Sequence, residues 1–450
     1  MLQIDKPYFL RASLCVAVIL GCTSSFAVSA KLSMQQLVEK AIQHDPWLTG
    51  NQLQERSLRM ASQGANNLPD PKLSLGVVNL PIDGFSFNQE PMTQLKVGVA
   101  QSFPRGDSLA LKQQQLSFQA DQYPYQRADR KAKIKVMVST LWLDALKAQL
   151  TINLIKRDRV LFEQLVEIVN ASYSAAQGNT RQQDVISAQL ELARLEDRLT
   201  VVKSLRDTAL SHLAEWLPSN EHLGLSSSFE EQISLPPYPE IKRHIRLVFQ
   251  RADHSGLLEL LIDHPAILAI EQSVKAGDKA VELAKQQYQP QWGVNASYAY
   301  RDDSSLGQSR ADFFSIGVTV DIPLWGYKKQ DSEVAATNLR AQSMQTDKRL
   351  LQQQMLGKML SLYQQKVRLE QREDGFLSSI LPQMQQQADA SLSAYTHDDG
   401  DFSQVMRARI AQLNAQIDLI ALQSQKHQTQ IQLEYFITRP ADVFNLGENR

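Results

Sequence analysis

The densest group of side chains that could do chemistry is the acidic stretch His397-Asp398-Asp399-Gly400-Asp401. Carboxylates gathered in one turn attract cations, and a ring of them around the axis of an oligomer can gate a pore. A simpler interpretation is also open, because Asp favours the position just before a helix and the other carboxylates would then face water. Both interpretations place the stretch in a turn between two helices.

No other pattern in the chain favours catalysis, a cofactor or a metal site. The eight histidines are scattered and form no His-x-x-x-His pair. Met355 and Met359 lie one helical turn apart, which suits a soft cation, although methionines at this spacing usually fill a core. There is no nucleophile elbow, phosphate loop or zinc spacing. We therefore predict a protein that is not an enzyme and holds neither a cofactor nor a metal.

The elements that carry the acidic stretch are predominantly helical. The chain has 450 residues and a formal net charge of −1, with only 19 Gly and 17 Pro. This composition favours long helices, and the near-zero charge gives no indication of nucleic-acid binding. After residue 30 no run approaches the ~20 apolar residues of a membrane helix. If the protein spans a membrane, it must do so with strands.

Residues 1–30 are predicted to be a signal peptide, with a short apolar core and small residues before Ala30. A second interpretation is a lipoprotein leader, because Ile19-Leu20-Gly21-Cys22 resembles a lipobox and lipid on Cys22 would anchor the chain. The helical pattern begins almost at once, at Leu32, and this favours cleavage after Ala30. Either way the protein is exported. Both cysteines lie in the leader, so the mature chain has no disulfide.

Two hairpins interrupt the helices, and they reveal a duplication. Strands are predicted at about 72–78 and 93–103, and again at about 291–300 and 312–322, because apolar residues alternate with polar ones. Three pairs of prolines share one offset of 219 residues, which is strong evidence for an internal repeat. These pairs are Pro46 and Pro265, Pro71 and Pro290, and Pro104 and Pro323.

Each repeat is predicted to contain a helix, a hairpin and an antiparallel helical pair. We place the first repeat at 31–217 with a turn near 177–180, and the second at 257–439 with a turn near 397–401. Residues 218–256 form a linker, and 440–450 an irregular tail. Pro124 is expected to interrupt the first long helix. Two seams at coiled-coil spacing suit knobs-into-holes packing. They are Val185, Ala188, Leu192, Leu195, Leu199 and Val202, and Met406, Ile410, Leu413, Ile417 and Ile420.

Four strands of this length suit a tilted crossing of a bilayer, but they are too few to close a barrel. Open strand edges are not tolerated in lipid. Either the strands form the edge of a soluble sheet, or several chains share one barrel. Three chains of four strands would supply twelve, an even number with a lumen wide enough for solutes.

The order of leader, helix, hairpin, helical pair, linker and repeat resembles the TolC-type outer-membrane factor family over residues 32–439. The segments LPDPKLSLGVVNLP, EPMTQLKVGVAQSFPRGDSLAL and GNTRQQDVISAQLEL resemble its CusC- and CzcC-like heavy-metal branch. The resemblance implies a mainly α protomer of a homotrimer. Its fold would be a shared 12-strand transmembrane β-barrel, with four strands per chain, continued by a long periplasmic α-helical coiled-coil barrel.

The resemblance also implies a function and partners. The protein would be the passive exit duct of a tripartite efflux system in the outer membrane of a Gram-negative bacterium, extending into the periplasm. Its partners would be membrane lipid, a periplasmic adaptor and an inner-membrane resistance-nodulation-division pump, and its cargo heavy-metal cations. General drug efflux, type I secretion and a soluble periplasmic coiled-coil scaffold are the alternatives.

The candidate site residues follow from the same resemblance. His397, Asp398, Asp399 and Asp401 would form a periplasmic gate, because the family places a closed and often acidic constriction at this end. Gly178, Asn179, Thr180 and Gly400 would contact the adaptor, or they only join helices. The loop at 79–92 would lie at the cell surface, where Phe85 and Phe87 line the outer mouth.

Overall fold

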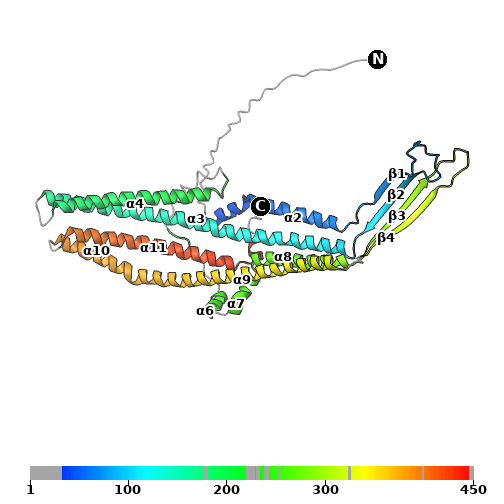
Figure 1. Ribbon diagram of the computed structural model, residues 1–450. Coiled ribbons are helices and arrows are strands. Elements are labelled where there is room, and N and C mark those ends of the chain that lie inside the picture. The colour runs from blue at the N-terminus through cyan, green and yellow to red at the C-terminus, as the bar shows by residue number, and fades with distance from the viewer. Residues whose placement is uncertain are drawn as a thin grey trace, which may run out of the picture.

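The chain folds into a long, narrow molecule with helices along most of its length and a sheet at one end (Figure 1). The computed structural model describes residues 33–175, 181–218, 229, 234–237, 243–251, 254–322, 326–397 and 400–444. The predicted leader, with Cys22, lies outside the described residues. The fold is mainly helical with one four-stranded sheet, as the sequence predicted.

The two predicted hairpins join into a single antiparallel sheet. Its strands are β1 (Lys72–Val78), β2 (Gln94–Phe103), β3 (Gln291–Tyr300) and β4 (Phe313–Asp321), and their order in space follows the order in the chain. The centre of the sheet is therefore the pairing of β2 with β3, which unites the two repeats. The strands β1 and β4 form its edges.

The helices form two sets that are related by the repeat. The first set is α1 (Met34–Gln43), α2 (Pro46–Ala65), α3 (Ser108–Ser174) and α4 (Gln182–Ala214). The second set is α7 (His254–Ile262), α8 (Pro265–Lys285), the 3₁₀ turn η2 (Gln286–Tyr288), α9 (Lys328–Gly375), the π-helical turn η3 (Phe376–Ile380), α10 (Leu381–Thr396) and α11 (Phe402–Phe436). Figure 1 shows the C-terminal ends of α3 and α10 and the N-terminal ends of α4 and α11 at the end opposite the sheet.

The second helix of each set begins in the same way, at the duplicated proline. Pro46 and Pro265 each occupy the first turn of a helix, where the missing N–H costs nothing. The residue before each proline caps the helix: the Asp45 carboxylate accepts the Trp47 N–H at 3.2 Å, and His264 Nδ1 accepts the Ala266 N–H at 3.2 Å. The duplicated sequence thus produces a duplicated local structure.

Pro124 does not interrupt the first long helix, contrary to the prediction. The helix α3 runs without a break for 67 residues. Proline removes one backbone hydrogen bond and crowds the preceding turn, so the surrounding contacts must hold the helix together. They do so on both sides of Pro124, because Gln126 accepts from Asn51 of α2 at 3.1 Å and Gln122 accepts from Ser273 of α8 at 2.8 Å.

The linker and the tail also contain helices that the sequence did not reveal. Within the predicted linker, α6 (Arg243–Gln250) packs beside α7, and Phe249 stacks on Tyr363 with ring centroids 4.4 Å apart. The tail predicted to be irregular begins with the short helix α12 (Pro440–Phe444). Ile245 and Phe249, which lie one turn apart on α6, are both buried in the cluster with α9.

Three apolar clusters along the helices form the core. The cluster near the two turns contains every residue of both predicted seams, so both seams take part in packing between helices. The helix α4 packs mainly on α3, and α11 packs on α3, α9 and α10. A second cluster joins α1, α3 and α4, and a third joins α6 to α9 and α11 and includes Met355 and Met359, which therefore fill core. Among the described residues, no helix is long and apolar enough to cross a membrane.

Candidate functional site

The strand register separates the sheet into two faces of opposite character. Residues opposite one another in antiparallel strands share a face, and successive residues alternate between faces. We call one side the apolar face: it consists of the odd-numbered residues of β1 and β2 and the even-numbered residues of β3 and β4. Gln101 is its single polar side chain apart from the tyrosine hydroxyls, and it carries no charge.

No part of the described chain covers the apolar face. Leu73 is 75% exposed, Leu75 72% and Ile316 69%, and none of the three core clusters includes a strand residue. A continuous apolar surface of this kind on a folded protein marks contact with lipid or with another protein.

Aromatic side chains lie at both ends of the apolar face. Phe103 and Trp292 are opposite one another at the helical end, and Tyr298, Tyr300 and Phe314 lie near the loops. The eight-residue step from Trp292 to Tyr300 spans ~26 Å at ~3.3 Å per residue. Strands of outer-membrane proteins present an apolar band ~25 Å tall between two aromatic girdles. The face has the dimensions and the pattern of such a band, with allowance for tilt.

The opposite side, which we call the polar face, is crowded and built from small residues. It consists of the even-numbered residues of β1 and β2 and the odd-numbered residues of β3 and β4. A Cβ on Gly98 would lie 2.8 Å from Ser74 Oγ and 3.4 Å from Ser297 Cβ. Because these contacts are shorter than those between flat neighbouring strands, the polar face is the concave side. A hollow of about 500 Å³ lies along it.

The two ends of the sheet are fastened by arginines. In the loops, Arg301 donates to the Pro91 carbonyl at 3.2 Å and Arg310 to the Glu90 carbonyl at 3.2 Å, so the second hairpin holds the first. At the helical end, Arg105 forms an ion pair with Asp321 and donates to the Gln289 carbonyl at 2.6 Å. These bonds fix the curvature of the sheet at both ends.

The described part of the acidic turn shows that Asp401 caps a helix. Its carboxylate accepts from the Ser403 N–H at 3.1 Å and from the Ser403 hydroxyl at 2.7 Å, at the start of α11. These hydrogen bonds lower the pKa of Asp401, and the positive charges of Arg407 and Arg181 lower it further. The start of α4, which Arg181 precedes, and the start of α11 share one apolar cluster that contains Val185 and Phe402.

His397 and Gly400 also have structural roles in this turn. His397 Nδ1 lies 2.8 Å from the Ser393 carbonyl and closes the last turn of α10. A Cβ on Gly400 would lie 2.8 Å from the Tyr395 backbone nitrogen, so only glycine fits there without rearrangement. The other predicted site residues lie outside the described part of the chain. These are Asp398, Asp399, Gly178, Asn179 and Thr180.

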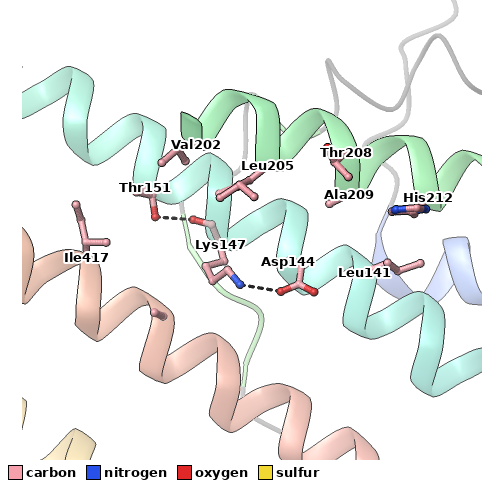
Figure 2. Close-up of a pocket in the computed structure, with 12 residues that line it drawn as sticks. Leu141, Asp144, Lys147, Thr151, Val202, Leu205, Thr208, Ala209, His212 and Ile417 are labelled. Atoms are coloured by element: carbon pink, nitrogen blue, oxygen red, sulfur yellow. Dashed lines mark hydrogen bonds and ion pairs between the residues drawn. The ribbon is translucent and has the colours of Figure 1, made fainter. Parts of the chain in front are cut away.

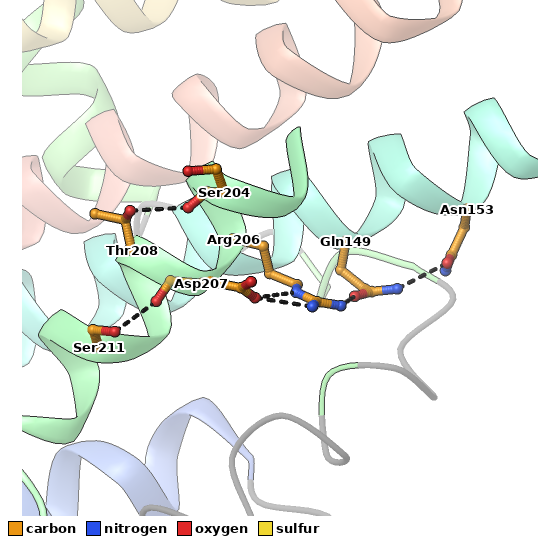
Figure 3. A network of polar contacts seen from close by, with 7 residues as sticks. All are labelled: Gln149, Asn153, Ser204, Arg206, Asp207, Thr208 and Ser211. Atoms are coloured by element: carbon orange, nitrogen blue, oxygen red, sulfur yellow. Dashed lines mark hydrogen bonds and ion pairs between the residues drawn. The ribbon is translucent and has the colours of Figure 1, made fainter. Parts of the chain in front are cut away.

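Sequence patterns did not predict the polar bonds that join the two repeats near these turns. Arg198 of α4 donates to Asn414 of α11, and Arg157 of α3 donates to Gln416 of α11 at 3.0 Å. Along the α3–α4 pair, Arg206 donates to Gln149 at 3.0 Å (Figure 3). Such long-range partners have no fixed spacing in the sequence.

A second hollow, of about 400 Å³, lies between α3, α4 and α11 (Figure 2). Its walls are mostly apolar, and its charged groups are engaged locally. Lys147 Nζ lies 2.8 Å from Asp144, and His212 Nδ1 lies 3.3 Å from Glu215. Among the described residues, no group of three or more His, Cys, Asp or Glu side chains could hold a metal ion. The hollow therefore offers no evident chemistry.

Comparison with solved structures decides the fold. CusC, which forms a transmembrane channel, matches with a TM-score of 0.70 and 12% identity, over 90% of this chain and 92% of that one. VceC, an outer-membrane protein of Vibrio cholerae, matches with a TM-score of 0.69 and 16% identity, over 90% and 96%. The open outer-membrane channel MtrE of Neisseria gonorrhoeae matches with a TM-score of 0.68 and 14% identity, over 96% and 97%.

This chain has the fold of an outer-membrane channel protomer. The likeness extends over nearly the whole length of both molecules in each comparison, so it includes the sheet as well as the helices. No family model and no curated protein matches the chain in sequence. At these identities the likeness concerns the fold, and the function rests on the surfaces described above.

Proposed function

We propose that the chain is one of three identical protomers of an outer-membrane exit duct, the passive channel of a tripartite efflux system. An inner-membrane resistance-nodulation-division pump would deliver the substrate through a periplasmic adaptor. The observation that carries this proposal is the apolar face, which is exposed, uncharged and edged by aromatic residues on a sheet with two open edges.

A shared barrel satisfies both surfaces that a single chain leaves exposed. Lipid would cover the apolar face. The edge strand β4 of one protomer would pair with β1 of the next, which removes edges that lipid does not tolerate. Twelve strands, four from each of three chains, would then enclose the concave polar face as a lumen. The long helices would continue the duct into the periplasm.

Membrane fractionation tests this proposal directly. The duct should be recovered from the outer membrane as a heat-modifiable trimer that resists dodecyl sulfate until it is boiled. A monomer released from the periplasm by osmotic shock would overturn the duct and favour a soluble scaffold. Mass spectrometry of the mature N-terminus would distinguish cleavage after Ala30 from lipidation of Cys22 in the same preparation.

For the cargo, we propose heavy-metal cations. The support is the resemblance of three segments to the heavy-metal branch. Deletion of the gene should sensitise cells to copper, silver, zinc, cobalt or cadmium. Sensitivity to drugs or detergents alone would reject the metal branch in favour of general drug efflux, and would leave the duct itself intact.

The helical end would carry the gate and the contact with the adaptor. Asp398, Asp399, Asp401 and His397 are the proposed gate residues, and Gly178, Asn179, Thr180 and Gly400 the proposed adaptor contacts. The apolar cluster shared by the starts of α4 and α11 supports a single composite tip made from both turns. Because the Asp401 carboxylate caps α11, Asp398 and Asp399 are the carboxylates that we propose for a ring.

A further inference from the structure

The polar face of the sheet carries an excess of positive charge. The four strands contain only three charged residues, Lys72, Lys96 and Asp321, and the register places all three on the polar face. Asp321 is neutralised by its ion pair with Arg105 at the helical end. Two lysines therefore remain on each chain's polar face, and the apolar face has no charge to offset them.

Both lysines are exposed and without a carboxylate partner among the described residues. Lys72 borders the hollow of about 500 Å³, together with Asn295 and Thr319. Lys96 lies further along, opposite Gly76 on one side and Ala299 on the other, so no bulky neighbour covers it. The two positions are thus separated along the concave side rather than clustered at one end.

Acidic residues nearby do not cancel these charges. In the loops, Asp303 accepts from the Arg310 N–H at 3.3 Å and Asp312 from the Arg301 N–H at 3.0 Å. These carboxylates are bonded within the loops, which lie beyond the strand ends in Figure 1. Within the four strands, Lys72 and Lys96 are therefore the charges that no opposite charge balances, and the nearest acidic residue in the chain, Asp70, lies just outside β1.

We propose that Lys72 and Lys96 form two cationic rings inside the shared barrel and that these rings favour the passage of anions. This proposal rests on the proposed trimer, in which two lysines from each of three chains would give six in one lumen. Charge that lines a water-filled passage between low-dielectric walls raises the local concentration of the opposite ion. The rings would act on whatever the pump delivers.

The rings also bear on the form in which a metal leaves. A bare divalent cation would be repelled by them, whereas a metal bound in an anionic complex, or an organic anion, would be attracted. The acidic tip and the lysine rings would then form two successive filters of opposite sign. Of the two, the rings would govern the last part of the path, through the outer membrane.

Reversal potentials in planar bilayers test the rings. The trimer would be measured under a potassium chloride gradient at low ionic strength, because at ~0.01 M salt the Debye length is ~30 Å and lining charges are poorly screened. Lys96→Gln should shift the reversal potential toward the potassium equilibrium potential, and Lys96→Glu should shift it further. Lys72→Gln combined with Lys96→Gln should exceed either single neutral variant.

The matched control is Lys96→Arg, which keeps the charge and should leave the reversal potential at the wild-type value. Equal reversal potentials for wild type, Lys96→Gln and Lys96→Glu, each recovered as a conducting trimer, would overturn the rings and leave the duct standing. Failure of the wild-type protein to form any pore would overturn the duct, and the rings with it.

Discussion

Two buried side chains hold equivalent positions in the two repeats but use different chemistry. Asp45 forms an ion pair with Arg130 at 2.8 Å, and the guanidinium of Arg130 lies over the Trp47 and Trp216 rings. His264 is fully buried, and its Nε2 lies 2.9 Å from the Tyr435 carbonyl. Because Nδ1 of His264 accepts the Ala266 N–H, the proton of the neutral ring is assigned to Nε2, which donates.

Burial lowers the pKa of His264, and this gives a pH dependence of stability. The unfolded chain then binds more protons than the folded chain below about pH 6.5, so stability should fall as the pH decreases through that range. Asn caps a helix as well as Asp does and does not titrate. His264→Asn should therefore flatten the decline of the thermal unfolding midpoint of the detergent-solubilised protein in mildly acidic buffer.

The control for this prediction is His212→Asn, which changes an exposed histidine on α4 that pairs with Glu215. Its unfolding midpoint should follow the wild-type pH dependence. If His264→Asn kept the full wild-type slope, another group would be responsible for the acid sensitivity.

Residue-level prediction from the sequence succeeded where the effect is local. An Asp just before a helix was an open alternative for the acidic turn, and Asp401 takes that position because its partner Ser403 is two residues away. His264 could not be recognised as a cap, since its burial and its bond to Tyr435 depend on a helix 171 residues later. Local chemistry is visible in sequence, and long-range contacts are not.

At the scale of elements, the strands were predicted from alternation alone, and the way in which the sheet closes follows from the repeat. Within the chain, Gln101 of β2 lies opposite Val294 of β3. Because the repeats are offset by 219 residues, Val320 of β4 is the counterpart of Gln101, and Leu75 of β1 is the counterpart of Val294. The same pairing between protomers would place Val320 of one protomer opposite Leu75 of the next. The registers of the two hairpins differ by two residues. A shift of that size between protomers would place Ile322 opposite Leu75, and both residues would still lie on the apolar face.

Paired cysteines should report this register. Cα atoms of opposite residues in antiparallel strands lie ~4.5–5.5 Å apart. This distance is within the range of ~4.4–6.8 Å that a disulfide spans. Leu75→Cys combined with Val320→Cys or with Ile322→Cys should form covalently linked chains on a non-reducing gel. Within one chain, β1 and β4 are separated by two strands, or ~14 Å across the sheet, so such a link must be between protomers.

Leu75→Cys with Thr319→Cys serves as the negative control, because Thr319 lies on the polar face. Efficient cross-linking of the control, or no cross-linking of either test pair, would contradict the pairing of β4 with a neighbouring β1.

The helices show the limits of predicting elements from sequence. The seams were visible in their spacing, whereas the continuity of α3 through Pro124 depends on contacts with α2 and α8.

The whole molecule has a sheet with an exposed apolar face at one end and the ends of α3, α4, α10 and α11 at the other. Its length and its two ends follow from the long helices, which the sequence predicted. In the proposed trimer, the lumen would form only where three polar faces meet, so no pattern within one chain could predict its charge. Charges that look scattered in one chain, such as Lys96 and Asp398, would act there through threefold repetition.

The proposed gate at the tip concerns the whole trimer, and the capping role of Asp401 limits the substitutions that can test it. Alanine at Asp401 would remove a helix cap worth ~0.5–2 kcal/mol and would change the fold of the turn as well as its charge. Asp401→Asn keeps the cap and removes only the charge. Asp398→Asn with Asp399→Asn removes the two carboxylates available to a ring. The double variant should raise single-channel conductance or weaken block by divalent cations. The reason is that a ring with fewer carboxylates attracts and retains fewer cations at the constriction.

A comparison of these variants distinguishes a ring from a cap. If the carboxylates converge on the axis, the double variant changes conductance or block, and Asp401→Asn changes them less, since the Asp401 carboxylate is already held by Ser403. If both variants match the wild-type channel in conductance and in cation block, the acidic turn only starts α11 and faces water.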